Sequence, residues 1–378
     1  MRVYHVVRQF WPSVGGLEDV VEHLAREQMA RGWSVKIITL DRVFAAPDER
    51  LAAEELYRGL EILRLPYRGS SRYPLAPTVL NAVRGADLLH VHAVDFFFDF
   101  LALTRFIHAT PQLATTHGGF FHTAAYAGLK RLWFNTITRA SVSAYEAIVA
   151  CGEADYDMFA PLARGTLHRI DNGVDIAKFA GCSSPVPVQH LATVGRFSTN
   201  KRLDRLLDMM QRLVAADGAW RLDIIGAPSD WSLARLESEV ASRRLEPHVR
   251  ILAAADNAAI ARVLSEASFF VSASEHEGFG LAAVEALSAG LRPVLHGNAA
   301  FRALKTRCDV VEIVDFTDPA GAAAAILRLW SEAETAYPQL RQKARDAARP
   351  FAWPGVADAY LALYEEILAR RKPGVRRG

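Results

Sequence analysis

The chain has 378 residues, of which 51% are hydrophobic and 23% charged, and its formal net charge is +2. This length predicts more than one hydrophobic core, and the composition is that of an ordinary soluble globular protein. So small a charge excludes recruitment of nucleic acid by a global positive field. Three cysteines form no CxxC pair, which predicts reduced thiols in the cytoplasm.

Membrane-spanning and secretory segments are not expected. No segment contains the roughly 18 consecutive uncharged apolar residues that a transmembrane helix needs, and MRVYHVVRQFWP has too short an apolar run for a signal peptide. We therefore expect a cytoplasmic protein whose membrane contact, if any, is peripheral. Basic residues gather in the C-terminal ARRKPGVRRG, which is either a solvated end or a contact for anionic lipid headgroups.

Short β-branched runs alternate with amphipathic segments through the first half of the chain. Residues 2–7 predict a buried strand, and LEDVVEHLAREQMARG predicts a helix that ends at Gly32. SVKIITL is the next predicted strand, and ADLLHVHA, PQLATTHG and EAIVACG are predicted strand ends that lead into loops. This alternation predicts a doubly wound parallel sheet whose ligand loops follow the carboxyl ends of its strands.

A stretch rich in glycine, serine and proline at residues 171–189 marks the predicted domain boundary. The alternation then restarts at HLATVGRF and continues through ASFFVSAS and LRPVLHG, and WPGVADAYLALYEEILARR predicts a closing amphipathic helix. The predicted α/β fold has two facing Rossmann-like domains with a ligand cleft between them. We assign 1–180 to the first domain, 181–350 to the second, and 351–378 to the closing helix with its basic tail.

Two loops carry candidate anion-binding residues. Gly15 and Gly16 lie between the first strand and the first helix, where backbone amides and the helix dipole favour an anion. They are not part of a GxGxxG motif, which argues against a dinucleotide dehydrogenase, and such a pair is equally an ordinary turn. Arg196 and Lys201 follow a strand of the second domain and are either a diphosphate clamp or solvated surface charges.

The segment SEHEGFGLAAVEALSAG places Glu277 in a glycine-rich turn and Glu285 inside a predicted helix. Backbone amides around Phe279, Gly280 and Leu281 would lie at the mouth of that helix. A carboxylate only accepts hydrogen bonds, so the two glutamates suit the vicinal hydroxyls of a sugar or a ribose better than a phosphate. The alternatives are a favourable first-turn charge for Glu285 and a solvated loop residue for Glu277.

Histidines also follow the predicted strands. His117 ends a strand beside two glycines, and it is either packed or directed at a ligand. His90 and His92 alternate along another strand and are interpreted as core or cleft residues, not metal ligands, because no acidic or cysteine partner stands at ligand spacing. The DYD at 155–157 falls in a predicted helix start and is interpreted as structural.

Together, the glycine pair, the His-Gly turn, the Arg/Lys pair and the Glu-x7-Glu element resemble the large family of retaining glycosyltransferases with the GT-B fold. The resemblance extends over nearly the whole chain. It implies that the second domain binds a sugar nucleotide, that the first binds the acceptor, and that the last helix crosses back onto the first domain. It further implies a reaction that needs neither a metal nor a cofactor.

The resemblance also implies a role for each candidate residue. Gly16, beside Gly15, would approach the donor phosphate or sugar, and His117 would hydrogen-bond the transferred sugar. Arg196 and Lys201 would neutralise the leaving group, and Glu277 would orient hydroxyls of the sugar. The amides of 279–281 would contact the sugar or the phosphate, and Glu285 would bind the ribose diol. The sequence departs from the family at Arg202, where glycine usually follows the lysine, which puts the loop conformation in doubt.

Within this family, the segments VVRQFWPSVGGLEDVV, YRGSSRYPLAP and TTHGGFFHTAAYA look like the α-mannosyltransferases of xanthan- and acetan-type exopolysaccharide assembly. This implies transfer of mannose from GDP-mannose to cellobiosyl-diphosphopolyprenol in an α-1,3 linkage at the cytoplasmic leaflet of the inner membrane. The aromatic segments at 96–100 and 120–134, the latter with Lys130 and Arg131, suit a peripheral membrane surface, with a buried helix as the alternative.

Other functions stay open on the sequence. One is a GT-B transferase with another donor, such as UDP-glucose, or with a soluble acceptor, because the guanine base cannot be read from the loop at 251–256. An epimerase is disfavoured by the combined motifs. A non-catalytic sugar-nucleotide-binding protein would retain the same binding residues and release no product.

Overall fold

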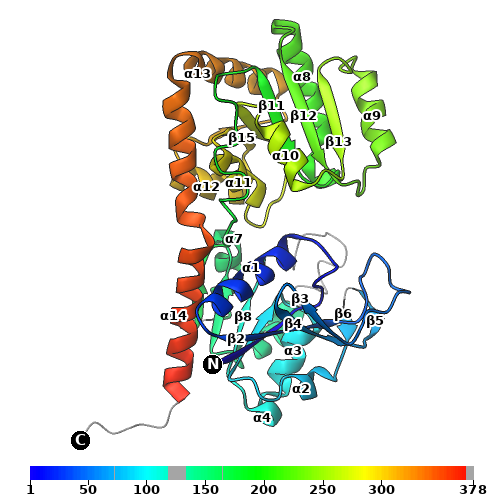
Figure 1. Ribbon diagram of the computed structural model, residues 1–378, viewed down its shortest axis with the longest axis vertical. Helices are drawn as coiled ribbons and strands as arrows, with labels where there is room; N and C mark the ends of the chain where they lie inside the picture. The colour runs from blue at the N-terminus through cyan, green and yellow to red at the C-terminus, as the bar shows by residue number, and fades with distance from the viewer. Residues whose placement is uncertain (72, 118–132, 164, 372–378) are drawn as a thin grey trace, which may run out of the picture. The chain divides into compact units, whose positions relative to one another are not determined.

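The computed structural model describes residues 1–71, 73–117, 133–163 and 165–371. The chain divides into two compact units, Met1–Gly173 with Trp353–Gly378, and Val174–Ala352. Each unit is an α/β sandwich around a mainly parallel sheet (Figure 1). The predicted α/β fold with two Rossmann-like domains is confirmed.

The N-terminal unit contains an eight-stranded sheet in the order β10-β9-β8-β7-β1-β2-β4-β3. Its strands are β1 (Arg2–Val6), β2 (Ser34–Leu40), β3 (Glu54–Tyr57), β4 (Leu60–Leu65), β7 (Leu88–His92), β8 (Gln112–Thr115), β9 (Ala147–Ala150) and β10 (Leu167–Arg169). Only the β3–β4 pairing is antiparallel, and β5 (Arg68–Ser70) with β6 (Tyr73–Leu75) forms a separate hairpin. Five strands of this unit, β3, β4, β5, β6 and β10, were not predicted, and all of them except β4 are three or four residues long and bury few side chains.

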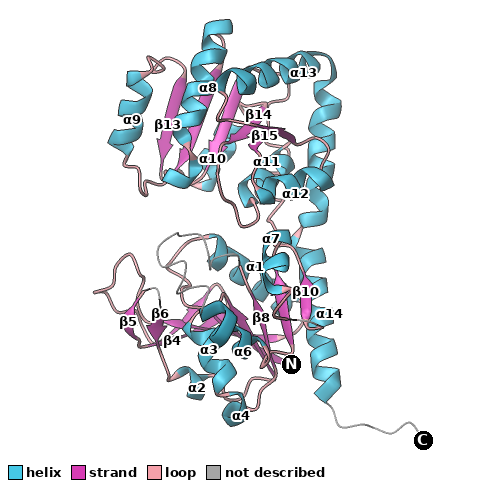
Figure 2. Ribbon diagram, turned by 180° about the vertical axis from the view of Figure 1, so that it is seen from behind, coloured by secondary structure: helices cyan, strands magenta, loops and turns pink. Residues whose placement is uncertain are grey.

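Helices cover both faces of this sheet (Figure 2). They are α1 (Gly16–Ala30), α2 (Val79–Ala82), α3 (Phe96–Leu103), α4 (Arg105–His108), the π-helical η1 (Phe134–Thr138), α6 (Arg139–Val142), α7 (Glu153–Phe159) and α14 (Trp353–Arg371). One hydrophobic cluster joins α1 and α14 to the sheet, and a second lies under α3.

The closing helix α14 belongs to the N-terminal unit. Trp353 at its start stacks on His23 of α1 with ring centroids 5.4 Å apart. The same indole covers Gly173, where a Cβ would lie 2.4 Å from the ring, so any larger residue at 173 would displace the tryptophan. Tyr360 and Tyr364, one turn apart, are buried against the sheet. These contacts fix α14 on the sheet face that α1 also covers.

The C-terminal unit contains a six-stranded, wholly parallel sheet in the order β13-β12-β11-β14-β15-β16. Its strands are β11 (His190–Val194), β12 (Arg221–Gly226), β13 (Val249–Ala253), β14 (Phe269–Ser272), β15 (Arg292–His296) and β16 (Glu312–Val314). Its helices are the 3₁₀ turn η2 (Thr199–Lys201), α8 (Leu203–Ala216), α9 (Leu233–Ser242), α10 (Asn257–Leu264), α11 (Leu281–Ala289), α12 (Ala299–Arg307), α13 (Pro319–Ala348) and the 3₁₀ turn η3 (Arg349–Phe351).

Two of the segments predicted to contact a membrane are not covered by the structure. Residues 118–132, with Lys130 and Arg131, and the basic residues of 372–378 lie outside the described part of the chain. Within the described residues, no helix is both long and apolar enough to cross a bilayer.

Candidate active site

The C-terminal sheet changes its direction of growth between the neighbouring strands β11 and β14. The loop after β11 carries Arg196 and Lys201, and the loop after β14 carries Glu277. In doubly wound sheets, ligands bind at the carboxyl ends of the strands beside such a switch point. The topology therefore places the predicted donor-binding residues where this fold binds ligands.

Lys201 and Glu277 connect the loop after β11 to the loop after β14. Lys201 Nζ donates to Glu277 Oε1 at 2.7 Å. Asn200 fastens the two loops together, since its Nδ2 donates to the His276 carbonyl at 2.8 Å and its Oδ1 accepts from the His276 amide at 3.0 Å. Gly195 lies beneath the lysine, because a Cβ there would meet Lys201 Cε at 2.9 Å. The sequence analysis missed Asn200, although it stands beside the predicted clamp.

Arg202 occupies the position where the family resemblance expects glycine. Its φ of +46° and ψ of 49° lie in the left-handed region, which glycine adopts without a steric cost. Its guanidinium donates to Asp204 at 2.7 Å and to Glu275 at 2.6 Å, and these carboxylates hold the strained residue in place. The loop therefore keeps the conformation that a glycine would favour, and Lys201 still reaches Glu277.

Helix α11 begins directly after Gly280, whose φ is +92°. A Cβ at this position would lie 2.8 Å from Phe301 Cε1, so the turn requires glycine. Phe279 packs against Phe351 with ring centroids 5.7 Å apart, and Leu281 is partly buried in the same cluster. With these side chains packed in the core, the backbone amides at the start of α11 are the groups suited to bind an oxygen-rich ligand.

Glu285 lies in the middle of α11 and faces a cation. Its Oε1 accepts a hydrogen bond from Lys178 Nζ at 3.0 Å, and both side chains remain partly exposed to solvent. No sequence pattern indicates Lys178, which is 107 positions away from its partner. Arg196 is exposed in the loop after β11, so its charge can meet a ligand with little loss of hydration.

In the N-terminal unit, the loop after β1 leads to α1 through Gly15 and Gly16. Glu18 turns back over Gly15, where a Cβ would meet its Oε2 at 2.7 Å, and it accepts a hydrogen bond from Ser13 Oγ at 2.9 Å. Gly16 is exposed as the first residue of the helix. A ligand phosphate at this end of α1 would therefore have an acidic side chain as its neighbour.

His117 follows β8 with a φ of +52°, a left-handed conformation that is uncommon for a residue with a side chain. Its Nε2 lies 2.9 Å from His92 Nδ1, and its Nδ1 lies 3.7 Å from Cys151 Sγ. A hydrogen bond from the ring of His117 to a sugar would replace one of these two contacts.

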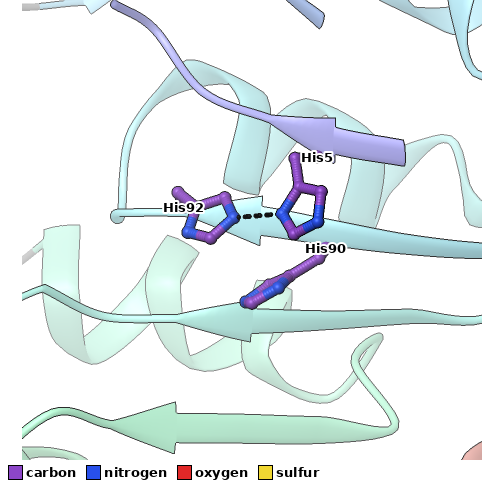
Figure 3. Close-up of side chains that lie close together, drawn as sticks. All are labelled: His5, His90 and His92. Carbon is purple, nitrogen blue, oxygen red and sulfur yellow. Dashed lines mark hydrogen bonds between the residues drawn. The ribbon is translucent and has the colours of Figure 1, made fainter. Parts of the chain in front are cut away.

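A chain of buried polar groups continues from His92 into the core (Figure 3). His92 Nε2 lies 2.8 Å from His5 Nδ1, and His5 Nε2 lies 2.7 Å from Gln28 Oε1. The amide of Gln28 donates to Tyr364 OH at 3.0 Å, so the chain ends on α14. This link arises because β1 and β7 pair in register, which sets His5 opposite His90.

The tautomers of the imidazoles along this chain depend on one another and on the orientation of the Gln28 amide. If His5 donates to Gln28 Oε1, its Nδ1 accepts from His92 Nε2, and His92 Nδ1 then accepts from His117 Nε2. Burial opposes the charged form of each imidazole, lowering the pKa of His5 to about 4 and that of His117 to about 3. His117 is therefore a neutral residue whose Nε2 is in contact with His92.

Two clusters contain enough donor groups to be considered as metal sites. In the cluster of His5, His90 and His92, the rings of His90 and His92 are tilted by 34° with centroids 4.0 Å apart, and both nitrogens of His90 contact hydroxyls at 2.6 Å. Near-stacked rings do not direct their in-plane lone pairs at one point, so this arrangement fits a hydrogen-bonded core better than a metal centre.

The second cluster consists of His190, Asp223 and Glu266, and the guanidinium of Arg250 already pairs with both of its carboxylates. Arg250 donates to both oxygens of Asp223 at 2.8 Å and to Glu266 at 2.7 Å. In the DYD segment, Asp155 lies on α7 and accepts a hydrogen bond from Thr116 Oγ1 at 2.7 Å.

Comparison with known proteins gives concordant matches for both units. Residues 14–178 match the family described as Glycosyltransferase Family 4, and residues 185–350 match Glycosyl transferases group 1. The chain is 42% identical over 97% of both chains to the GDP-mannose:cellobiosyl-diphosphopolyprenol alpha-mannosyltransferase of Xanthomonas campestris. It is 40% identical to the enzyme of that name from Komagataeibacter xylinus, over 99% of this chain and 95% of the relative.

A solved structure shares the fold of the whole chain. Sucrose-phosphate synthase from Thermosynechococcus elongatus superposes with a TM-score of 0.76 at 18% identity, covering 98% of this chain and 99% of that one. At this identity, the likeness supports the fold alone.

Proposed function

The chain belongs to the GT-B glycosyltransferase family, and from this membership we propose that it transfers mannose from GDP-mannose to cellobiosyl-diphosphopolyprenol with retention, forming an α-1,3 linkage. The observation that carries the proposal is 42% identity along 97% of the chain to a relative named for this donor and acceptor. Family membership makes the chain a glycosyltransferase; the sugar, the lipid acceptor and the linkage belong to the proposal.

The C-terminal unit is proposed to bind the donor. Lys201 and Arg196 would neutralise the diphosphate that leaves, and Glu277 would accept hydrogen bonds from hydroxyls of the mannose. The amides of 279–281 would contact the sugar or the phosphate, and Glu285 would accept from the ribose diol. The Lys201–Glu277 contact of 2.7 Å supports this pairing of roles, since the sugar and its phosphate are covalently joined in the donor.

The N-terminal unit is proposed to bind the acceptor, with Gly16 and His117 near the transferred group. In the proposed reaction the acceptor hydroxyl attacks from the face that the diphosphate leaves. The leaving phosphate accepts the hydroxyl proton, while Arg196, Lys201 and the helix-start amides stabilise its developing charge. His117 is not assigned the role of a base, because burial lowers its pKa to about 3 and so makes its imidazole a weak proton acceptor.

The reaction is proposed to need no metal, because protein cations and amides supply the positive charge at the diphosphate. Transfer measured in excess EDTA tests this point, and activity equal to that without chelator is expected. Complete loss of transfer that magnesium restores would contradict it. The proposed location is the cytoplasmic face of the inner membrane, with peripheral attachment.

The function is tested by incubating the protein with lipid-linked cellobiose and either GDP-mannose or UDP-glucose. Transfer from GDP-mannose alone supports the proposal. Transfer only from UDP-glucose would show that the donor is UDP-glucose, and tight binding of GDP-mannose without any product would indicate a non-catalytic protein.

A further inference from the structure

An apolar groove lies on the N-terminal unit between α3 and the η1–α6 segment, with a volume of about 530 Å³. Its first wall is one face of α3, which presents Phe96, Phe100 and Leu103 at helical spacing. Its second wall presents Ile137 and Ala140 among its residues. Two helical segments thus form the sides of a mainly apolar depression.

The groove opens onto a cluster of exposed apolar side chains. Leu103 is 78% exposed, Phe106 82% and Ile107 68%. Scattered single apolar residues are normal on a protein surface, but a cluster beside an apolar groove indicates a binding surface. All of these residues belong to α3 and the following α4.

The charged groups of the groove are engaged within the protein. Asp99 accepts hydrogen bonds from Ser141 Oγ at 2.7 Å, Tyr73 OH at 3.0 Å and Trp133 Nε1 at 3.3 Å. Arg105 donates to the Ser143 carbonyl at 3.1 Å, and its guanidinium carbon lies 4.6 Å from the centre of the Phe106 ring. The groove therefore offers its occupant mainly hydrocarbon contact.

The direction of the groove connects it to the ligand-binding edge of the sheet. Helix α3 begins four residues after the end of β7, beside the switch point between β1 and β7. Ligands bind at this edge in doubly wound sheets. An eight-residue helix is about 12 Å long, so the wall from Phe96 to Leu103 leads from the ligand edge toward α4.

We propose that this groove binds the first isoprene units of the lipid-linked acceptor. The proposal rests on the proposed function, because the relatives' name supplies the polyprenyl chain. A polyisoprenoid is uncharged, branched and flexible, so it can fill an apolar groove and gains free energy from burial of its methylene and methyl groups. A peptide or a sugar would need hydrogen-bond partners in the groove, whereas Asp99 and Arg105 already make hydrogen bonds within the protein.

The test compares two acceptors that share the cellobiosyl diphosphate head and carry either a long polyprenyl chain or only a methyl group, which leaves the groove empty. The variant Ala140→Glu adds bulk and charge at an exposed helical position of the groove wall, and Leu103→Ser removes apolar surface. The matched control is Leu56→Ser, since Leu56 is 70% exposed on β3 of the same unit and does not line the groove.

For the long-chain acceptor, both groove variants are expected to raise KM about tenfold, as loss of one well-buried apolar contact would do. Their kinetics with the methyl acceptor and those of the control should match the wild type. An equal effect on both acceptors, or no effect on either, would overturn the proposal. So would an equal loss of binding to phosphatidylglycerol vesicles that contain no prenyl lipid, because that result would assign the face to the bilayer.

Binding of a sugar-free polyprenyl diphosphate in detergent micelles separates the groove from the function. If the wild type transfers no mannose but binds this lipid, and Ala140→Glu weakens the binding about tenfold, the proposed function fails and the groove stands. If the wild type transfers mannose while Ala140→Glu binds this lipid normally, the groove fails alone.

Discussion

The ammonium of Lys201 lies 2.7 Å from the carboxylate of Glu277, 76 positions later in the sequence. The two residues meet because β11 and β14 are neighbours at the switch point of the C-terminal sheet. A donor diphosphate placed beside this pair would meet the lysine, and the attached sugar would meet the glutamate. The pair therefore presents complementary groups to the two ends of one glycosyl-phosphate bond.

Lys201→Ala is expected to lower kcat/KM about 100-fold, because one preorganised cation that stabilises a developing negative charge contributes on this order. Glu277→Gln should also lower activity, since an amide oxygen accepts from sugar hydroxyls more weakly than a carboxylate does. Lys343→Ala is the control, because Lys343 forms an exposed ion pair with Asp309 at 2.7 Å. Near-wild-type turnover of both site variants would remove these residues from the site.

Gly280→Ala should destabilise the protein by about 1–3 kcal/mol, through a positive φ and a clash with Phe301. It should also lower activity by shifting the first turn of α11. Gly278→Ala is a close control, since a Cβ at Gly278 meets nothing within 4 Å. Urea unfolding of both variants measures the difference, and equal stabilities would refute the steric argument.

Arg202→Gly and Arg202→Ala both remove the contacts to Asp204 and Glu275, but only alanine has to adopt a strained left-handed conformation. The glycine variant is therefore expected to be more stable than the alanine variant by about 1 kcal/mol. Urea unfolding at neutral pH tests this order. A more stable alanine variant would show that the loop changes conformation when the guanidinium is lost.

Acid should destabilise the N-terminal unit through its buried histidines. The folded-state pKa of His5 is lowered to about 4 by burial, whereas its ordinary value is 6.5. Between these two values the unfolded chain binds the proton and the folded chain does not, so the free energy of unfolding falls as the pH falls. Each such histidine contributes a slope of about 1.4 kcal/mol per pH unit.

His5→Gln tests this linkage, because glutamine does not titrate. Urea unfolding of the wild type and the variant between pH 6.5 and pH 4 gives the free energy of unfolding as a function of pH. Its slope should be smaller in the variant by about 1.4 kcal/mol per pH unit, which corresponds to one proton. His248→Gln is the control, since the partly exposed His248 lies in the other unit and is not part of the buried chain. Identical slopes in the wild type and His5→Gln would mean that His5 is protonated in the folded protein.

Regular elements were predictable wherever their burial left a clear pattern. The strand SVKIITL and the helix WPGVADAYLALYEEILARR coincide with β2 and α14. The exposed strand β3 left no such pattern, because its residues from 54 to 56 are all exposed. Side-chain partners across the fold were less accessible still. The His5–His92 contact joins residues 87 positions apart and depends on strand order and register, which periodicity alone does not determine.

In the candidate site, too, local motifs were predictable and contacts between distant parts of the sequence were not. Residues within short motifs, such as Arg196, Lys201 and Glu277, could be selected from their sequence context as loop residues after strands. The pairing of Glu285 with Lys178 could not, because the lysine comes from a loop of unrelated sequence. The left-handed Arg202 was recognised only as a departure from the family, and the structure shows that two carboxylates hold it there.

Linkage analysis of the product formed from GDP-mannose and cellobiosyl-diphosphopolyprenol tests the central claim most directly. We expect one α-linked mannose on the 3-hydroxyl of the terminal glucose, with transfer reduced about 100-fold in Lys201→Ala. A β-linked product, or a product formed at the same rate by Lys201→Ala, would contradict it.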